Sequence, residues 1–273
     1  MPSLSDVFEG AQRVNKFQEN LAYSICTMVT DASQYSACLK TFHAQGFLEP
    51  DCEFLFVDNS NGNEYDAFTG LNLFLRRARG RHVILCHQDI RLIDDGRERL
   101  DSLLAELDRL DPKWGLCGNA GGLHGGGAAI RITDPINANA RVGGPFPARC
   151  ESLDENFIVA RAAANLTLSS DCQGFHHYGT DLCVIADILG YRAYVIDFHL
   201  QHLSDGDDGP VFHELRRSMI RKYQRALRPR LIETTNTTMP LTSSVALGLI
   251  GRSGKGVLLW QWFLRQTSRP NSP

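Results

Sequence analysis

The feature that most restricts the fold is a repeated order: a short apolar segment, a few polar residues, then a segment with helical spacing. The apolar segments are residues 23–29, 53–57 and 82–86, and the segments with helical spacing are residues 36–44 and 67–78. Apolar runs this short, bounded by polar residues, are typical of buried strands. Strands that alternate with helices predict an α/β fold with a parallel, doubly wound sheet and right-handed crossovers.

The polar residues after these strands are expected to lie along one edge of the sheet. In chain order they are Thr30, Asp31, Asp58, Asn59, His87, Gln88 and Asp89. Because side chains alternate along an extended strand, His87 and Asp89 should point to the same side. Open α/β sheets bind ligands at the carboxyl ends of their strands. The sequence therefore predicts a metal or diphosphate site near His87 and Asp89.

Composition narrows the class of protein. With 273 residues, 43% hydrophobic residues and a net charge of -3, the chain can bury a full core and is not basic enough for general nucleic-acid binding. Eight cysteines are scattered without a CxxC pair, which favours reduced thiols. The first ten residues lack the basic start and apolar core of a signal peptide, and no apolar run approaches the ~20 residues of a membrane span. We therefore expect a cytoplasmic protein.

The order of the motifs resembles that of GT-A glycosyltransferases, and more specifically the family-two group of nucleotide-sugar-dependent enzymes. In that family the second strand commonly ends in Val-Asp-Asp/Asn-Gly/Ser, which residues 57–60 (VDNS) resemble, and a later strand ends in Asp-x-Asp. Here His87 stands at the first aspartate position and Asp89 keeps the second. The matched elements run from about residue 20 to about residue 205.

The resemblance implies a GT-A (Rossmann-like) fold, with a mixed, mainly parallel sheet flanked by helices. It implies the transfer of a sugar from a nucleotide-diphosphate sugar to an acceptor hydroxyl of a carbohydrate or lipid-linked glycan, with no role for nucleic acid. A single general base opposite the leaving group implies inversion. The leaving diphosphate implies a divalent metal, Mn²⁺ or Mg²⁺, and a histidine ligand shifts the preference toward manganese.

The resemblance also implies roles for individual residues. Asp181, at the start of a predicted helix, is expected to be the catalytic base, and Asp89 and His202 are expected to bind the metal, with His87 as a further candidate ligand. The residues expected to bind the donor are Thr30, Asp31, Asp58, Asn59, His87 and Asp89. The residues expected on the acceptor side are Asp154, His176, His177 and Tyr178.

Each assignment has a structural alternative. Asp31, Asp58, Asp89 and Asp181 can cap a turn or a helix, and a histidine in an apolar stretch can be a hydrogen-bonded core residue. For the whole protein, the missing first aspartate allows a non-catalytic nucleotide- or glycan-binding protein of GT-A type with a degenerate metal site. A nucleotidyltransferase is disfavoured because no basic, glycine-rich loop follows the first strand. The glycine-rich residues 118–127 are expected to form a pliable loop beside the cleft.

The end of the chain changes character. We expect a catalytic domain over residues 1–228. Over residues 229–273 we expect a linker, near residues 234–238, and an apolar and basic tail that forms a helical extension. The tail could hold the protein at the inner face of a membrane, or pack on the catalytic domain or on a second copy of the chain. Packing is favoured here, because apolar helices of water-soluble proteins are usually buried.

Overall fold

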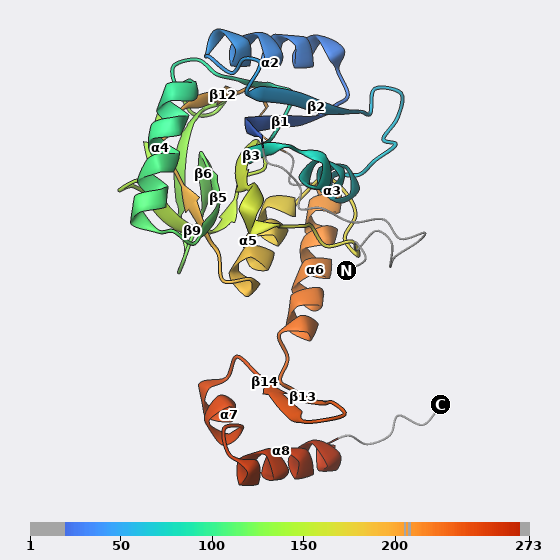
Figure 1. Cartoon of the computed structure of the whole chain (residues 1–273). Helices are drawn as coiled ribbons and strands as arrows, with labels where there is room; N and C mark the ends of the chain where they lie inside the picture. Colours follow the sequence, from blue (N-terminus) through green and yellow to red (C-terminus); the bar gives the residue numbers. More distant parts are fainter. Residues whose placement is uncertain (1–19, 205, 207–208, 268–273) are drawn as a thin grey trace, which may run out of the picture. The chain divides into compact units, whose positions relative to one another are not determined.

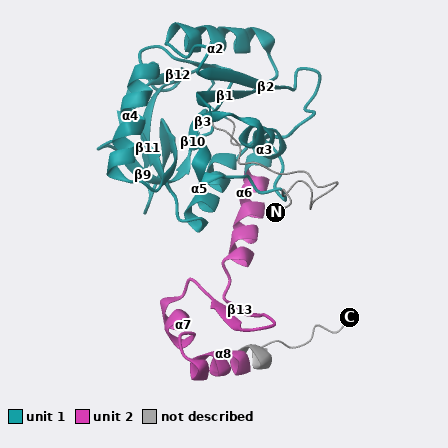
Figure 2. Cartoon of the chain, in the orientation of Figure 1, with its two compact units in different colours: residues 1–212 teal, residues 213–273 magenta. Residues whose placement is uncertain are grey.

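The structure is a computed structural model that describes residues 20–204, 206 and 209–267. The chain divides into two compact units, residues 1–212 and residues 213–273 (Figure 2). This division falls inside helix α6 (Pro210–Ala226), before the boundary that we expected at residue 228. The N-terminal residues from which we judged the absence of a signal peptide lie outside the described residues.

The first unit contains one large sheet with helices around it. Its helices are α2 (Ala32–Ala44), α3 (Ala67–Arg77), α4 (Arg97–Leu110), α5 (Tyr178–Ile188) and the short 3₁₀ helix η1 (Ala162–Ala164). Its strands are β1 (Leu21–Val29), β2 (Cys52–Asp58), β3 (Gly80–Cys86), β4 (Ile90–Arg91), β5 (Trp114–Gly118), β6 (Ala120–Leu123), β7 (Ala128–Thr133), β8 (Ala140–Val142), β9 (Ala148–Leu153), β10 (Phe157–Arg161), β11 (Arg192–Val195) and β12 (Leu200–His202).

The expected α/β class, a mixed sheet flanked by helices, is confirmed (Figure 1). The strand order is β2-β1-β3-β10-β5-β11-β9-β6-β7-β12-β4, and β8 pairs with β7. Parallel pairs join β1 to β2 and β3, β5 to β11, and β7 to β12, whereas the other described neighbours pair antiparallel. The sheet is therefore less parallel than expected, because short connections turn the chain back between β6, β7 and β8.

Helices cover both faces of the sheet. On one face, Tyr23 and Ile25 of β1 share a core with Phe42 of α2 and Leu103 of α4. On the other face α3 lies very close to β1, because a Cβ atom added to Gly70 would come within 2.8 Å of the Met28 side chain. The alternation of side chains along β1 thus buries both of its faces, as expected for a central parallel strand.

The register of the sheet brings the carboxyl ends of β1, β2 and β3 and the amino end of β10 to one edge. In the parallel part, Val29 pairs with Asp58 and Thr27 pairs with Cys86, so β1, β2 and β3 end together. β10 runs the opposite way, and its first residue, Phe157, pairs with Cys86. Residues 154–156, which precede β10, therefore lie at the edge where β3 ends.

The second unit contains the part of α6 from residue 213, helices α7 (Val245–Ile250) and α8 (Gly254–Thr267), and a hairpin of β13 (Arg230–Glu233) and β14 (Thr238–Leu241). The expected helical extension is present. The segment that we expected to be a linker is the turn of the hairpin, closed by hydrogen bonds from the Thr234 and Thr237 main chains. Among the described residues, no helix is long and apolar enough to cross a membrane.

Candidate metal and donor site

His87, Asp89 and His202 form a cluster at the edge where β3 ends. His87 and Asp89 follow β3, and His202 arrives from β12, which pairs with β4 through His202 and Ile90. His202 Nε2 lies 3.2 Å from His87 Nδ1 and 3.4 Å from Asp89 Oδ1, and His87 Nδ1 lies 3.9 Å from Asp89 Oδ1. All three residues therefore present one ligand atom to the same small volume.

The protonation states of His87 and Asp89 favour binding of a cation. Burial lowers the pKa of His87, and the neighbouring His202 lowers it further, so this imidazole is neutral near pH 7. Burial alone would raise the pKa of Asp89, but the hydrogen bond and charge of His202, together with His87, bring this pKa down to about 2. The cluster thus offers one carboxylate and at least one neutral imidazole.

Tyr178 orients the His87 ring. The Tyr178 hydroxyl donates to the Glu155 main-chain oxygen over 3.0 Å and lies 2.9 Å from His87 Nε2. A hydroxyl has a single proton, so it accepts from His87 Nε2–H, and the proton-free nitrogen of His87 is Nδ1. That nitrogen is the one that faces His202 and Asp89. A second hydroxyl, Ser204 Oγ, lies 3.0 Å from His202 Nε2.

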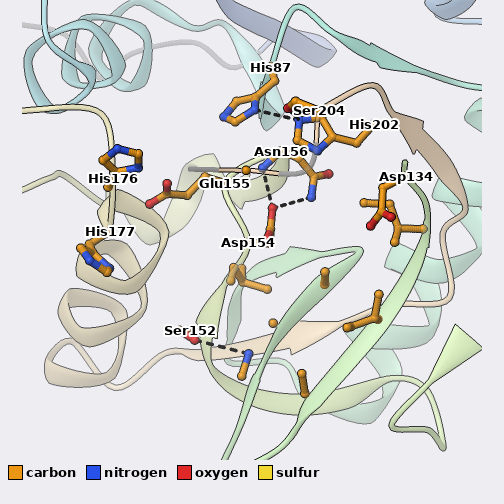
Figure 3. A pocket seen from close by; sticks show the side chains of 18 of the residues that line it. His87, Asp134, Ser152, Asp154, Glu155, Asn156, His176, His177, His202 and Ser204 are labelled. Carbon is orange, nitrogen blue, oxygen red and sulfur yellow. Dashed lines mark hydrogen bonds between the residues drawn. The ribbon is translucent and has the colours of Figure 1, made fainter. Parts of the chain in front are cut away.

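A pocket of about 580 Å³ opens beside the cluster (Figure 3). Its lining includes His87 and His202, Asp134, residues 152–156 that lead into β10, and residues 175–177 that precede α5. The Glu155 carboxyl group, also in this pocket, has a shifted pKa. Burial, with a contribution from Asp154, raises this pKa to about 8. Figure 3 shows Glu155 extending on the same side as His176.

A second pocket, of about 240 Å³, shares His87 with the first. Its lining includes Thr30, Asn59, His87, Gln88, Asp89, Phe175 and Tyr178 together with apolar residues of β1, β3 and α3. Gln88 fixes its rim, since its Oε1 accepts from the Thr30 and Asp31 main-chain N–H groups and its Nε2 donates to Thr30 Oγ1. His87 lines both pockets, so the cluster stands between them.

The structure brings most of the predicted donor residues together, but not Asp31 and Asp58. Asp31 caps α2 by accepting from the Ser33 and Gln34 main chains, and Asp58 accepts from the Ser60 main chain and hydroxyl. These hydrogen bonds lower the pKa of both carboxyl groups. Neither residue lines the second pocket, so both carry out the capping role that was their structural alternative.

Asp181, which we expected to be the catalytic base, lies in α5 and outside both pockets. Its side chain is buried and accepts from the Ser169 main-chain N–H and hydroxyl, each over 2.8 Å. The first turn of α5 places Asp181 toward the segment before the helix, whereas Tyr178, three residues earlier, points to His87. This placement does not fit a group that must reach a substrate, so we do not retain the assignment.

The predicted acceptor-side residues Asp154, His176 and His177 line the larger pocket, and Tyr178 lines the smaller one. Asp154 Oδ1 also accepts from the Asn156 main chain and amide, which holds the turn between β9 and β10. His177 adopts a left-handed backbone conformation with φ of 62°, and its Nε2 lies 3.1 Å from the Phe212 main-chain oxygen. The expected glycine loop is partly strand β6, and its Gly121 and Gly122 line the larger pocket.

Sequence reasoning missed Glu155 and Ser204, and it placed Gln88 along the edge of the sheet without assigning it a role. A carboxylate in a turn before an antiparallel strand has no spacing that distinguishes it from a solvent-exposed residue. The one available signal for Glu155 was its position directly before the apolar segment that follows Asn156. This position indicates a place at the pocket only if β10 runs antiparallel to β3, and the strand pattern alone did not show that direction.

Comparison with known proteins identifies a close relative. The sequence is 39% identical over 240 residues to a Fuscovulum blasticum protein named "ATP synthase subunits region ORF 6", and the match covers 86% of this chain and 94% of the relative. This chain belongs to the same family as that ORF 6 protein. The relative's name states no reaction, so the activity of the ORF 6 family has to be argued from the site. No family model matches the sequence.

Two solved structures are similar at low sequence identity. A mannosyltransferase from Pyrobaculum calidifontis in complex with GDP-Man and Mn²⁺ is 13% identical, with a TM-score of 0.49 over 82% of this chain and 70% of that chain. S. aureus TarS in complex with UDP-GlcNAc is 12% identical, with a TM-score of 0.49 over 73% of this chain and 65% of that chain. Both TM-scores lie below 0.5, so the functional assignment depends on the residues of the site.

Proposed function

We propose that the protein is a metal-dependent glycosyltransferase of GT-A type, which moves a sugar from a nucleoside-diphosphate sugar to an acceptor hydroxyl. The observation that carries this proposal is the cluster of His87, Asp89 and His202 between two pockets. A cation site with a pocket on each side suits a donor whose diphosphate joins a nucleoside to a sugar. The smaller pocket then takes the nucleoside, and the larger one takes the sugar and the acceptor.

The cluster fits a divalent cation. Ligand atoms about 2.1 Å from one ion are about 3.0 Å apart in octahedral geometry and about 3.4 Å apart in tetrahedral geometry. The two separations that involve His202, 3.2 and 3.4 Å, lie in this range, and the third is 3.9 Å. Two imidazoles and one carboxylate favour Mn²⁺ over Mg²⁺, which prefers oxygen ligands. A bound Mn²⁺ would stabilise the negative charge that develops on the leaving diphosphate.

The smaller pocket has the surfaces that a nucleoside needs. Apolar side chains of Met28, Leu71 and Phe175 can contact a base, and the polar Thr30 and Asn59 lie at the strand ends. The Asn59 side chain is itself held, because its amide donates to the Tyr65 oxygen and its oxygen accepts from the Tyr65 N–H. We therefore assign donor binding to Thr30, Asn59, His87 and Asp89, and we do not carry Asp31 and Asp58 further.

We assign the general base to Glu155. Its carboxyl group lines the larger pocket, and its main chain is fixed by the Tyr178 hydroxyl and its side chain by the Gly179 N–H, which donates to Oε1. A base is most effective when its pKa lies near the working pH, and that of Glu155 is raised to about 8. A carboxylate that removes the acceptor proton on the side away from the diphosphate gives inversion at the anomeric carbon.

The test is calorimetric titration of nucleoside diphosphates with and without Mn²⁺. We expect one nucleotide to bind only with Mn²⁺, and Asp89→Ala to weaken this binding at least about a hundredfold. Glu106→Ala, an exposed carboxylate on α4, is the matched control and should bind as the wild type does. Release of the diphosphate from a panel of sugar nucleotides, with Mn²⁺ present, then identifies the donor.

The non-catalytic alternative predicts a different result. A degenerate metal site would leave nucleotide or glycan binding that is independent of Mn²⁺ and of Asp89, without turnover of any donor. Such a result would remove the catalytic proposal while keeping a binding role for the pockets. The replacement of a carboxylate by His87 is the observation that makes this control necessary.

A further inference from the structure

The second unit carries a charge opposite to that of the remainder of the chain. Residues 213–273 contain eleven Lys and Arg residues and two Asp and Glu residues, which gives a net charge of +9. Because the whole chain has a net charge of -3, residues 1–212 carry -12. A charge asymmetry of this size favours contact of residues 213–273 with anionic groups.

The same unit exposes large apolar side chains on both of its short C-terminal helices. On α8, Leu258 is 65% exposed, Trp262 59% and Phe263 58%, and on α7 Val245 is 80% exposed. Trp260 is the exception, with 4% exposure. Trp260 lies with Leu247 and Ile250 of α7 along one groove, so its burial is packing within the second unit, whereas these other side chains remain largely open.

The exposed side chains of α8 form one continuous arc. At 100° per residue, Leu258, Leu259, Trp262 and Phe263 fall within less than half of the helix circumference. Lys255, in the first turn, falls inside the same arc and is exposed, and Arg252 is exposed in the connection between α7 and α8. An open apolar groove of about 270 Å³ runs between the two helices and is lined by Leu247 and Ile250 of α7 and by Leu259, Trp260, Trp262 and Phe263 of α8.

We propose that this surface, formed by α7, α8 and the connection between them, docks on an anionic phospholipid membrane. The arc of Leu258, Leu259, Trp262 and Phe263 would enter the boundary between headgroups and acyl chains. The charges of Lys255, in the first turn of the same arc, and of Arg252, in the connection before α8, would meet lipid phosphates. Tryptophan is well suited to this depth, because its ring is apolar and its N–H is polar.

A membrane fits this surface better than the other occupants. A second copy would bring two units of net charge +9 together, which opposes association. A nucleic acid would pair with the basic residues but would leave Val245 and Leu258, whose side chains offer neither charge nor a ring for stacking, in water. Only a lipid surface provides phosphate groups and an apolar layer next to each other.

Vesicle flotation of the full chain tests the proposal. We expect binding to vesicles of phosphatidylcholine with phosphatidylglycerol, weak binding to phosphatidylcholine alone, and a blue shift of tryptophan emission on binding. The variants Trp262→Ser with Phe263→Ser, and Arg252→Glu with Lys255→Glu, should each weaken binding at least about tenfold. These side chains are exposed, and circular dichroism checks that the variants fold.

Matched controls on the first unit are Leu110→Ser for the apolar change and Arg76→Glu with Arg77→Glu for the charge change, and both should bind as the wild type does. Three results would overturn the proposal: no vesicle binding, dimers in light scattering that the Trp262 and Phe263 changes dissociate, or binding to an oligonucleotide without binding to vesicles. Nucleotide binding is measured separately, without vesicles. A failure to bind vesicles therefore does not contradict the proposed glycosyl transfer.

Discussion

Glu155 has a pKa that links the proposed chemistry to stability. The carboxyl ionises near 4.5 in the unfolded chain and near 8 in the folded protein, because burial disfavours its charge. Between these values the folded state holds a proton that the unfolded state has lost, so stability falls as the pH rises from about 4.5 to about 8. Glu155→Gln removes this loss. By calorimetry, we expect a higher thermal midpoint than the wild type at pH about 9 and little difference at pH about 4.

The same residue should control the rate. If Glu155 is the general base, kcat/KM of the wild type rises with pH to a plateau above an apparent pKa near 8. Glu155→Gln should lower kcat by about 10²- to 10⁴-fold and remove this limb of the profile. A variant that keeps both the rate and the pH profile would show that Glu155 is not the base.

Tyr178 should act on the metal through His87. Tyr178→Phe removes the hydroxyl that accepts from His87 Nε2–H, so the ring loses the contact that keeps Nδ1 proton-free. Loss of such an outer partner weakens metal binding about 10- to 100-fold. Titration with Mn²⁺, followed by electron paramagnetic resonance, measures this change, and Tyr35→Phe on α2 is the control. Equal affinity in both variants would remove Tyr178 from the site.

At the scale of elements, the sequence predicted the parallel part of the sheet and less of its surroundings. The apolar runs that became β1 and β3 are continuous because both faces of these strands are largely buried, whereas β2, at the edge of the sheet, is only partly buried. The apolar run of β3 made the positions of His87 and Asp89 predictable. β10 has an equally apolar sequence, but its direction depends on long-range pairing with β3. The contribution of Glu155 to the pocket could therefore not be predicted.

At the start of α5 the sequence pattern was clear, but it fitted two different roles. An acid in the first turn of an apolar helix satisfies a helix cap and a catalytic motif equally well, so the sequence could not distinguish the two for Asp181. We expect Asp181→Asn to destabilise the protein by about 1–3 kcal/mol in urea, because it weakens two hydrogen bonds with Ser169 in a buried site. The folded fraction should keep its kcat. A loss of kcat without a loss of stability would restore Asp181 as the base.

At the scale of the whole molecule, the two units should respond differently to the metal. His87, Asp89 and His202 all lie in the first unit, where Mn²⁺ would join the ends of β3 and β12. A ligand that binds the folded state stabilises it by about 2.7 kcal/mol at a hundred times its Kd. This stabilisation should act on residues 1–212 and leave residues 213–273 unchanged.

The tryptophans allow this to be measured, because Trp114 lies in the first unit and Trp260 and Trp262 lie in the second. A variant with Trp260→Phe and Trp262→Phe reports the first unit, and Trp114→Phe reports the second. We expect Mn²⁺ to raise the thermal midpoint seen by Trp114 and not the one seen by the other pair, and Asp89→Ala to abolish the shift. If Mn²⁺ raised both midpoints equally, the two units would unfold as one cooperative structure, and the division at residue 212 would have no thermodynamic meaning.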